Sequence, residues 1–400
     1  MAFEKFELGQ MKRMIVESEK DGVRVTIETE TLAPATSELR TEITSYPSPH
    51  INIQPVRVGL MRSKGHLLAR RSTSLAVAYM AKHFNIDMSF FNPEDIDFEN
   101  KTVNAIIIEN NVRSRKVIPL PKIIDNDIRC FRGEIGKSVN KLRDYCYFIR
   151  PIDGMTKQRF HDALLKDGRF KEFLIETHPL DNVEDFLKLL EQYKDVILKP
   201  LHGVGGAGVS RITCDGKQYV ANLKNKKFNL SNDELLQFYE ENFTKLKYIL
   251  QPYINSQTKQ GNPFDIRIHA RRGAGGKFKT ISYPRIGNAE GVVSNLATGG
   301  YIAGIDSFLK SEFGDDWKIV YDKLSAFSNT FPDYYQSFFP DTIFDIGIDV
   351  GIQKRGDSYE LKLFEAYIQP GTAYIELEDA VICLEYYSYV NQKLQKESIK

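Results

Sequence analysis

An apolar stretch that carries a lysine leads directly into a glycine-rich segment near the middle of the chain. The run DVILKP (195–200) has the composition of a buried strand and places Lys199 close to its end. The segment LHGVGGAG that follows contains the string GxGxxG, with glycines at these positions: Gly203, Gly205, Gly206 and Gly208. Glycine lets backbone N–H groups converge on an anion, and a neighbouring lysine adds a fixed positive charge. The pattern predicts a phosphate-binding loop, with a flexible surface hairpin as the alternative.

The residues after the glycines distinguish this loop from two other phosphate-binding motifs. A dinucleotide-binding fingerprint requires a helix that opens at the glycines. Here VSRITCDG (209–216) is short, rich in β-branched residues and ends in a turn, so it predicts a strand, and the loop joins two strands. A second string, GEIGKS (133–138), resembles the end of a Walker A loop, but Phe131 stands where the first glycine is required. We expect an ordinary turn into a helix there.

Two acidic residues near the C-terminal end lie in strongly apolar surroundings. Asp349 in IGIDVGI and Glu365 in LKLFEAYI fall on two predicted strands that pair through the turn KRGD. A buried carboxylate requires a counter-charge, and Mg²⁺ binds one or two carboxylates and completes its shell with phosphate oxygens and water. The two acids therefore predict a metal site. The alternative is that they face an edge and pair with one of three basic neighbours: Lys354, Arg355 or Lys362.

Charged residues on two further predicted strands fit the same chemistry. Asp265 and Arg267 lie two positions apart on the predicted strand DIRIHARR. An aspartate at a strand end can bind a ribose, and an arginine can neutralise phosphate. The alternative is that the two residues form a structural ion pair. Arg285, in YPRIG, is a candidate for contact with a transferring phosphate, or else a solvated strand residue. Six other basic residues are candidates for binding an acidic substrate, with a solvated basic surface as the alternative: Arg62, Lys64, Arg70, Arg71, Arg271 and Arg272.

The length of 400 residues predicts two or three compact units, and the composition is that of a globular protein. It is 42% hydrophobic and 27% charged with a net charge of +1, which gives no reason to expect a nucleic-acid or membrane partner. The chain has no apolar run of the roughly 18 residues that would span a membrane, no signal-peptide core, and cysteines without metal-ligand spacing. We therefore expect a cytoplasmic protein with reduced thiols, whose oligomeric state the sequence leaves open.

Three segments differ in their patterning. Residues 1–50 form a polar N-terminal extension, and 51–155 alternate strands with a helix, as in a small α/β domain. From 156 onward, two amphipathic helices precede DVILKP, and several strands, a mostly helical stretch (307–338), a hairpin and a final helix follow. We expect an α+β unit over 156–400.

The order of these motifs resembles that of the ATP-grasp superfamily. The lysine strand and glycine hairpin are followed by QPYI (251–254), then by D-I-R, P-R, S-N-L, G-G, D-I-G-I-D and F-E-x-x-x-x-P-G. The resemblance covers roughly 155–375 and is greatest to the YheC/YheD-type, spore-coat-associated branch and to ribosomal-protein glutamate ligases. It implies the ATP-grasp fold, in which two α+β subdomains, here about 156–250 and 251–400, clamp ATP after a small α/β domain.

The resemblance also implies roles for individual positions. Gln251, Tyr253 and Ile254 match the hinge whose backbone reads adenine, and Asp265 matches the ribose-binding acid. The implied nucleotide-binding set is Lys157, Lys199, Gly203, Gly205, Gly206, Gly208, Gln251, Tyr253, Ile254 and Asp265. The implied catalytic residues are Arg285, Arg267 and Asn295, and Asp349 and Glu365 are the implied ligands of Mg²⁺, or of Mn²⁺ in its place.

One position departs from the family pattern. The family reads E-x-N before Pro-Gly, whereas this chain has Glu365-Ala-Tyr367. Three outcomes stay open: Gln369 or water completes the metal shell, one metal suffices, or ATP binds without rapid turnover. The implied activity is the ATP-dependent activation of a carboxylate as an acyl phosphate and its coupling to an amine, on amino-acid or peptide substrates. The alternatives are a non-catalytic ATP-binding coat or assembly protein, and a phosphotransferase that acts on a hydroxyl group.

Overall fold

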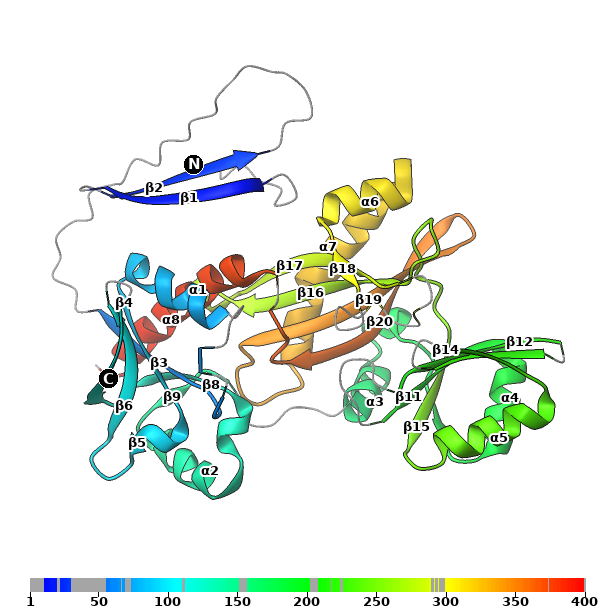
Figure 1. Ribbon diagram of the computed structural model, residues 1–400, viewed down its shortest axis with the longest axis horizontal. Coiled ribbons are helices and arrows are strands. Elements are labelled where there is room, and N and C mark those ends of the chain that lie inside the picture. The colour runs from blue at the N-terminus through cyan, green and yellow to red at the C-terminus, as the bar shows by residue number, and fades with distance from the viewer. Residues whose placement is uncertain are drawn as a thin grey trace, which may run out of the picture.

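The protein forms three β-sheets with covering helices, and a separate N-terminal hairpin. A computed structural model describes residues 11–19, 22–29, 55–65, 67–68, 73–109, 112–150, 157–201, 208–216, 218–223, 226–288, 291, 294, 299–372 and 374–398. In chain order we call the sheets first, second and third, and the third lies between the other two (Figure 1). Strands β1 (Met11–Glu19) and β2 (Gly22–Thr29) pair only with each other among the described strands.

The first sheet has seven strands in the order β5-β6-β4-β3-β8-β9, with β7 paired to β6. Strands β3, β4, β8 and β9 run parallel, as expected where helices and strands alternate. Their bounds are β3 Val56–Met61, β4 Ile86–Phe91, β5 Ile96–Asp97, β6 Thr102–Glu109, β7 Val112–Pro119, β8 Ile123–Asn126 and β9 Tyr147–Phe148. Helices α1 (Thr73–Met80) and α2 (Gly133–Asn140) accompany them, and α2 confirms the turn into a helix expected at GEIGKS.

The second sheet is wholly antiparallel, in the order β10-β15-β11-β12-β13-β14. Its strands are β10 His178–Leu180, β11 Asp195–Pro200, β12 Ser210–Asp215, β13 Gln218–Leu223, β14 Lys226–Leu230 and β15 Tyr248–Pro252. Helices α4 (Val183–Tyr193) and α5 (Asn232–Phe243) pack apolar residues against it, and side-chain caps at Asn182 and Ser231 start both helices. Because β11 pairs antiparallel with β12, the glycine segment joins two strands, as predicted.

The third sheet is also antiparallel and carries the candidate site. Its order is β18-β17-β16-β19-β20, with bounds β16 Phe264–Arg272, β17 Phe278–Ile286, β18 Tyr301–Ile302, β19 Asp345–Arg355 and β20 Ser358–Ile368. Helices α3 (Lys157–Asp167), α6 (Ile305–Phe313) and α7 (Trp317–Gln336) cover one face. That face supplies buried Ile266, Ile268, Ile346 and Ile348 to the core, so every second residue of these strands points the other way.

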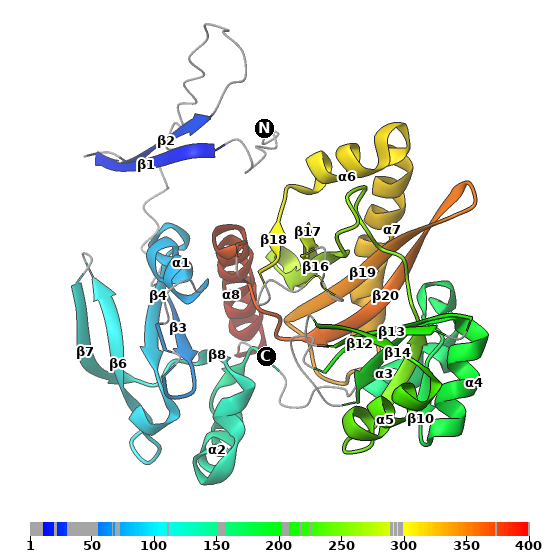
Figure 2. The same ribbon diagram turned by 45° about the vertical axis from the view of Figure 1, so that its right-hand side comes forward.

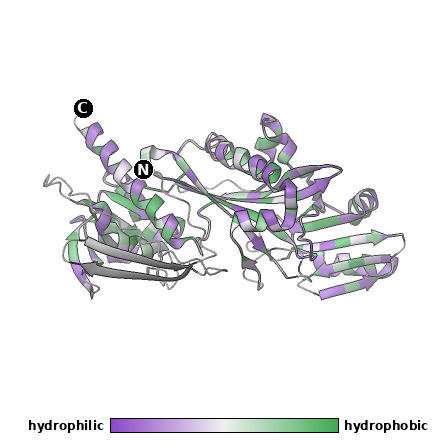
Figure 3. Ribbon diagram, turned by 90° about the horizontal axis from the view of Figure 1, so that it is seen from above, coloured by the Kyte–Doolittle hydropathy of each residue, from purple (hydrophilic) through white to green (hydrophobic). Residues whose placement is uncertain are grey.

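The last helix, α8 (Glu376–Ser398), returns to the first sheet. Ala380, Leu384 and Tyr387 of α8 are buried together with Val58 and Val77, and α8 lies beside α1 (Figure 2). In Figure 3 the helices carry hydrophobic and hydrophilic residues side by side, as expected of helices that cover a sheet on one side. The final helix therefore links the end of the predicted 156–400 unit to the core of the segment 51–155.

Candidate functional site

Strand register brings the predicted charged residues onto one face of the third sheet. Asp265 and Arg267 are two positions apart on β16, so they share a face. Arg285 lies opposite Asp265, Asp349 lies opposite Arg267, and Glu365 lies opposite Asp349. The face runs across β17, β16, β19 and β20 and is opposite to the one that the helices cover. Residues far apart in the sequence are thus assembled by antiparallel pairing alone.

Four of these residues form an unbroken chain of ion pairs, which we call the charged tetrad: Asp265, Arg285, Asp349 and Arg267. Arg285 donates two hydrogen bonds to Asp265, from Nε at 2.7 Å and from Nη2 at 2.5 Å. Its Nη2 also lies 2.8 Å from Oδ2 of Asp349. Arg267 donates to Asp349 from Nε (2.5 Å) and Nη2 (3.2 Å). Asp265 therefore pairs with Arg285 rather than with Arg267, the partner that the sequence suggested.

The arginines control the protonation of the tetrad. Burial raises the pKa of Asp349, but Arg285 and Arg267 outweigh burial and hold this pKa below its ordinary value. The same contacts raise the pKa of Arg285 and Arg267 against the effect of burial. For Asp265, burial outweighs the effect of Arg285 and raises the pKa of this carboxyl. With both aspartates ionised, the tetrad contains two negative and two positive groups, and its formal charge is zero. The sequence also offered Arg355 and Lys362 as alternative ion-pair partners of Asp349. Both contact Glu360 instead, near the turn of the same hairpin.

Ser294 is a member of the site that the sequence did not single out by itself. Its Oγ donates to Oδ2 of Asp265 at 2.6 Å, and the residue is 7% exposed. A ribose hydroxyl would have to share Asp265 with Ser294 and Arg285. The string S-N-L contains this serine, but a serine in a loop has no distinguishing pattern, and only its contact with Asp265 reveals its place.

A β-bulge in β20 shapes the region around Glu365. Asp349 pairs with Glu365 and Val350 with Leu363, so Phe364 is the extra residue of the bulge. Its ring lies over Gly351, where an added Cβ would be 2.3 Å from Cζ of Phe364. Lys199 Nζ, from the second sheet, is 5.5 Å from the centroid of the same ring. The predicted phosphate-binding lysine therefore lies beside Phe364, the residue of β20 that precedes the predicted metal ligand Glu365.

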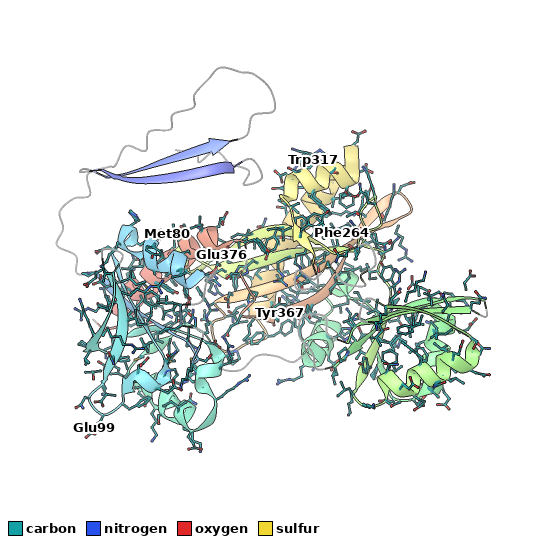
Figure 4. All side chains as sticks on the ribbon, viewed as in Figure 1. Met80, Glu99, Phe264, Trp317, Tyr367 and Glu376 are labelled. Atoms are coloured by element: carbon teal, nitrogen blue, oxygen red, sulfur yellow. The ribbon has the colours of Figure 1, made fainter. Side chains whose placement is uncertain are left out.

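Tyr367, which stands where the family has asparagine, lies in the central part of the molecule (Figure 4). Its ring centroid is 5.4 Å from the guanidinium carbon of Arg267, and a Cβ at Gly347 would be 3.2 Å from its Cζ. Burial, together with Asp349, raises the pKa of the Tyr367 phenol, so it is protonated and neutral at pH 7. A neutral phenol is a poor ligand for Mg²⁺, which prefers carboxylate and phosphate oxygens.

The predicted hinge lies at the end of the second sheet. Gln251 is on β15, and its Nε2 donates to Oγ1 of Thr177 at 2.8 Å. The backbone N–H of Tyr253 donates to Asp195 O (2.9 Å), and Ile254 O accepts from Ser256 N (2.8 Å). These bonds hold the segment that leads from β15 to β16. The N–H of Tyr253 and the carbonyl of Ile254 are thereby engaged within the protein. The predicted roles of the hinge residues towards adenine stay predictions.

Several predicted residues lie wholly or partly outside the described residues. Gly203, Gly205, Gly206 and Asn295 are outside, and so is the side chain of Lys157, at which α3 begins. Gly208 is described: its φ of +78° lies in the left-handed region that favours glycine, next to Pro200 at the end of β11. A non-glycine residue at 208 would strain the return into β12.

The arginines proposed for an acidic substrate are engaged inside the protein instead. Arg271 is 2% exposed and pairs with Asp345 and Asp379, each at 2.8 Å. Arg272, on the opposite side of the strand, donates to backbone oxygens of Ile343 and Gly276. Arg62 contacts Asp125 at 3.2 Å. The hypothesis of an exposed basic substrate surface is therefore wrong for these three, because buried acids balance two of them and backbone carbonyls bind the third; Arg70 and Arg71 lie outside the described residues.

The donor set supports a metal ion only in part. Among the described residues, no group of three or more His, Cys, Asp or Glu side chains is arranged to hold a metal by itself. Half-buried Glu365 could share Mg²⁺ with nucleotide phosphates and water, which is the usual way a protein binds this ion beside a nucleotide. Asp349 fits less well, because arginine donors contact both of its oxygens.

Strand β11 of the second sheet carries Lys199 near its end, and this lysine lies beside the third sheet with its buried charged tetrad. This pairing of two sheets is the architecture expected of an ATP-grasp protein. A family model described as "YheC/D like ATP-grasp" matches residues 147–390, which is more than half of the chain. The chain belongs to this YheC/D-like ATP-grasp family, and the predicted fold is confirmed.

Two relatives from Bacillus subtilis (strain 168) are similar over most of the chain. The endospore coat-associated protein YheD is 24% identical over 326 residues, covering 76% of this chain and 70% of that protein. The endospore coat-associated protein YheC is 26% identical over 298 residues, covering 71% and 81%.

Solved structures with similar folds include two synthetases. D-cycloserine synthetase DcsG aligns with a TM-score of 0.47 and 12% identity, over 82% of this chain and 99% of that one. D-alanyl-alanine synthetase A from Vibrio cholerae aligns with a TM-score of 0.44 and 11% identity, over 86% and 98%. Among the described residues, no helix is both long enough and apolar enough to cross a membrane.

Proposed function

We propose that this protein is an ATP-dependent ligase that activates a carboxylate as an acyl phosphate and couples it to an amine on an amino-acid or peptide substrate. The observation that carries the proposal is the assembly of Lys199, Glu365 and the charged tetrad around β20 and its neighbours. Such a site would offer the side chains of Lys199, Arg267 and Arg285 to phosphate. An acyl phosphate route does not need a side-chain nucleophile paired with a base.

The chemistry follows from charge and position. An oxygen of the substrate carboxylate attacks the γ-phosphorus, the bond to the β,γ-bridging oxygen breaks, and ADP leaves. The amine then attacks the carbonyl carbon of the acyl phosphate, inorganic phosphate leaves with the bonding electron pair, and the amine loses a proton. Arg285 and Arg267 would stabilise the negative charge on the transferring phosphoryl oxygens because their positions are fixed before reaction.

Lys199 and the glycine segment would hold the nucleotide phosphates from the second sheet. Closure of the two sheets would exclude water from the acyl phosphate. When bound at Glu365, Mg²⁺ or Mn²⁺ would offset the phosphate charge. Gln251, Tyr253 and Ile254 would line the adenine site, Asp265 would contact the ribose, and Lys157 and Asn295 keep the nucleotide-binding and catalytic roles that the resemblance implies.

An ADP-release screen tests the proposal. Amino acids and acidic peptides are supplied singly and in pairs to the wild-type protein and to Glu365→Gln, with Glu360→Gln at the far end of the same strand as the control. We expect ADP release that requires both a carboxylic acid and an amine, with a large loss in Glu365→Gln only. Equal activity in wild type and Glu365→Gln would refute the role of Glu365, and a stable phosphorylated alcohol would identify a phosphotransferase instead.

A non-catalytic assembly role is the second candidate, and a specific observation favours it. Both relatives are described as endospore coat-associated, and Tyr367 removes a metal ligand from the family pattern. ATP binding without ADP release across the whole substrate panel would support this role. Such a protein would use the nucleotide to fix the arrangement of its sheets, and its localisation would follow the assembly that it joins.

A further inference from the structure

The backbone at Gln369 adopts a conformation that glutamine normally avoids. Its φ of +56° lies in the left-handed region, where the Cβ of a residue other than glycine is crowded. The next residue, Pro370, lies against β19, because a Cβ added to Gly347 would be 2.7 Å from Cβ of Pro370. Backbone strain of this kind persists only where the surroundings enforce it, and it gathers at binding sites. Glycine would suit this backbone better, which points to a role for the glutamine side chain.

The side-chain amide of Gln369 has a defined orientation. Its Oε1 accepts a hydrogen bond from the backbone N–H of Ile128 (3.4 Å), the first residue of a short 3-10 helix (Ile128–Phe131) that follows β8. A backbone N–H can only donate, so the amide turns its oxygen towards Ile128 and its NH2 group away from it. The sequence left open that Gln369 completes a metal shell. The atom that would bind a cation is the amide oxygen, and this oxygen already serves the contact with the first sheet.

The NH2 group of Gln369 is a donor without an acceptor. Nε2 is buried, and no hydrogen-bond partner contacts it among the described residues. Leaving a buried donor unpaired costs free energy, and nearly all such groups in native proteins bind protein, water or a ligand. An amide NH2 group has only N–H donors to offer, so it binds a carbonyl or carboxylate oxygen and not a cation.

Gln369 lies where the third sheet meets the first sheet. Along β20, Phe364 lies beside Lys199 of the second sheet, and Tyr367 lies beside the charged tetrad. Gln369 comes next and contacts the first sheet through Ile128. Ile128 follows the carboxyl end of β8, which pairs in parallel with β3, and parallel sheets bind ligands at this edge. If the nucleotide phosphates lie near Lys199, a substrate that reaches away from them approaches Gln369.

We propose that Gln369 binds a substrate of the ligase reaction, through a hydrogen bond from Nε2 to a carbonyl or carboxylate oxygen other than the one that is phosphorylated. This inference rests on the proposed function. It assigns to the substrates at least one such further oxygen, which amino acids and peptides have and which simple monocarboxylic acids and simple amines lack. The left-handed backbone and the bond to Ile128 fix the donor before the substrate arrives, which lowers the entropy cost of binding.

Steady-state ADP release tests this role with the acid and amine pair that the wild-type protein turns over fastest in the screen described above. Gln369→Gly suits the left-handed backbone and removes the unpaired donor, so it should unfold at the wild-type temperature or above. Because one hydrogen bond to the substrate is lost, we expect KM for the acid or for the amine to rise roughly tenfold. KM for ATP should stay unchanged. Gln369→Glu, which replaces the NH2 group by an acceptor, should raise the same KM at least as much.

Lys101→Gly is the matched control. Lys101, in the turn before β6, also has a left-handed backbone, with a φ of +52°. This variant should gain the same backbone relief and leave all three KM values unchanged.

The outcomes separate the inference from the proposed function. Unchanged KM values for the acid and the amine in both Gln369 variants would overturn the inference, whatever their stability. A rise confined to KM for ATP, with an increased Mg²⁺ requirement, would place Gln369 in the metal shell and overturn it as well. If the wild-type protein releases no ADP with any pair, the proposed function fails, and the inference falls with it.

Discussion

In the charged tetrad, each ionised side chain has an opposite charge directly across the neighbouring strand. Asp265 faces Arg285, and Arg267 faces Asp349. Removing charges from water is costly, and near-ideal pair geometry is needed to compensate that cost. A site built in this way keeps its arginines at fixed positions before any ligand arrives, which is the condition for efficient electrostatic stabilisation of a phosphoryl group.

Lys199 gives the most direct residue-scale prediction. Its ammonium group lies near Phe364 at the boundary between the second and third sheets. Because a hydrogen bond to a charged group contributes about 1.5–3 kcal/mol, Lys199→Met should weaken binding of an ATP analogue roughly 10- to 100-fold. Isothermal titration calorimetry measures this change. Lys188→Met, an exposed lysine on α4, is the matched control and should bind as the wild type does; equal affinities for both variants would contradict the assignment.

At the scale of elements, the bulge in β20 decides how the face of the third sheet meets the second sheet. A regular strand would alternate Phe364 and Glu365 between opposite faces. The extra residue breaks that alternation beside Asp349, and the missing side chain at Gly351 leaves room for the ring of Phe364. A glycine in the middle of an 11-residue strand is thereby explained by a close contact rather than by backbone freedom.

Gly351→Ala tests the bulge. The new methyl group would collide with the ring of Phe364, so the ring must shift from its present place beside Lys199. Overpacking of this kind costs about 1–3 kcal/mol, so the free energy of unfolding in urea should fall by that amount, and ATP-analogue binding should weaken as well. Gly304→Ala, before α6, meets only Ser307 Oγ at 3.9 Å and should leave both quantities unchanged. A variant as stable as the wild type would show that the ring contact is unimportant.

The elements were predictable where a local pattern defined them. The strand after the glycines was expected from VSRITCDG and is β12, and the amphipathic VEDFLKLLEQYK is α4. The tetrad was not predictable in this way. Which arginine faces which aspartate depends on the register in which β16 pairs with β19, and residues 273–344 separate these two strands in the sequence. The apolar neighbours of Asp349 in the sequence indicated that it needs a counter-charge, and a metal was the predicted one; that Arg267 and Arg285 lie across the sheet from it is visible only in the fold. The metal role of Asp349 stays a prediction.

At the scale of the whole molecule, a second buried network ties the first sheet to the third. Arg150, after β9, donates to Asp125 of β8 at 2.8 Å and also to Asp345 of β19. Asp345 contacts Arg271, which contacts Asp379 on α8, and Tyr387 of α8 donates to Asp125 at 2.5 Å. Together with the apolar packing of α8, this network makes the first sheet a rigid neighbour of the candidate site.

Arg150→Met should therefore destabilise the whole protein. It leaves Asp125 and Asp345, which are 1% and 2% exposed, without one of their counter-charges. Breaking a buried pair by removing one partner typically costs about 3–5 kcal/mol, whereas an exposed pair is worth at most about 1 kcal/mol. Arg115→Met, which removes an exposed pair with Asp95, is the control. Chemical unfolding measures both, and similar losses in the two variants would show that the network does not join the sheets.

The same network predicts how stability depends on pH. Burial raises the pKa of Asp125, but Arg150 and Arg62 outweigh it, and the pKa is held below its ordinary value of 3.8. A carboxyl whose pKa is lower in the folded state than in the unfolded state stabilises the fold above the unfolded value. That contribution disappears as the pH falls towards the folded value. Below about pH 4, the free energy of unfolding should therefore fall by up to about 1.4 kcal/mol per pH unit from this group alone.

Asp125→Asn lacks the titrating group, so it should be less stable at pH 7 but lose less stability between pH 5 and pH 3. Thermal unfolding of both proteins across this range at constant ionic strength measures the difference, and parallel pH profiles would exclude Asp125 as a source of the acid sensitivity.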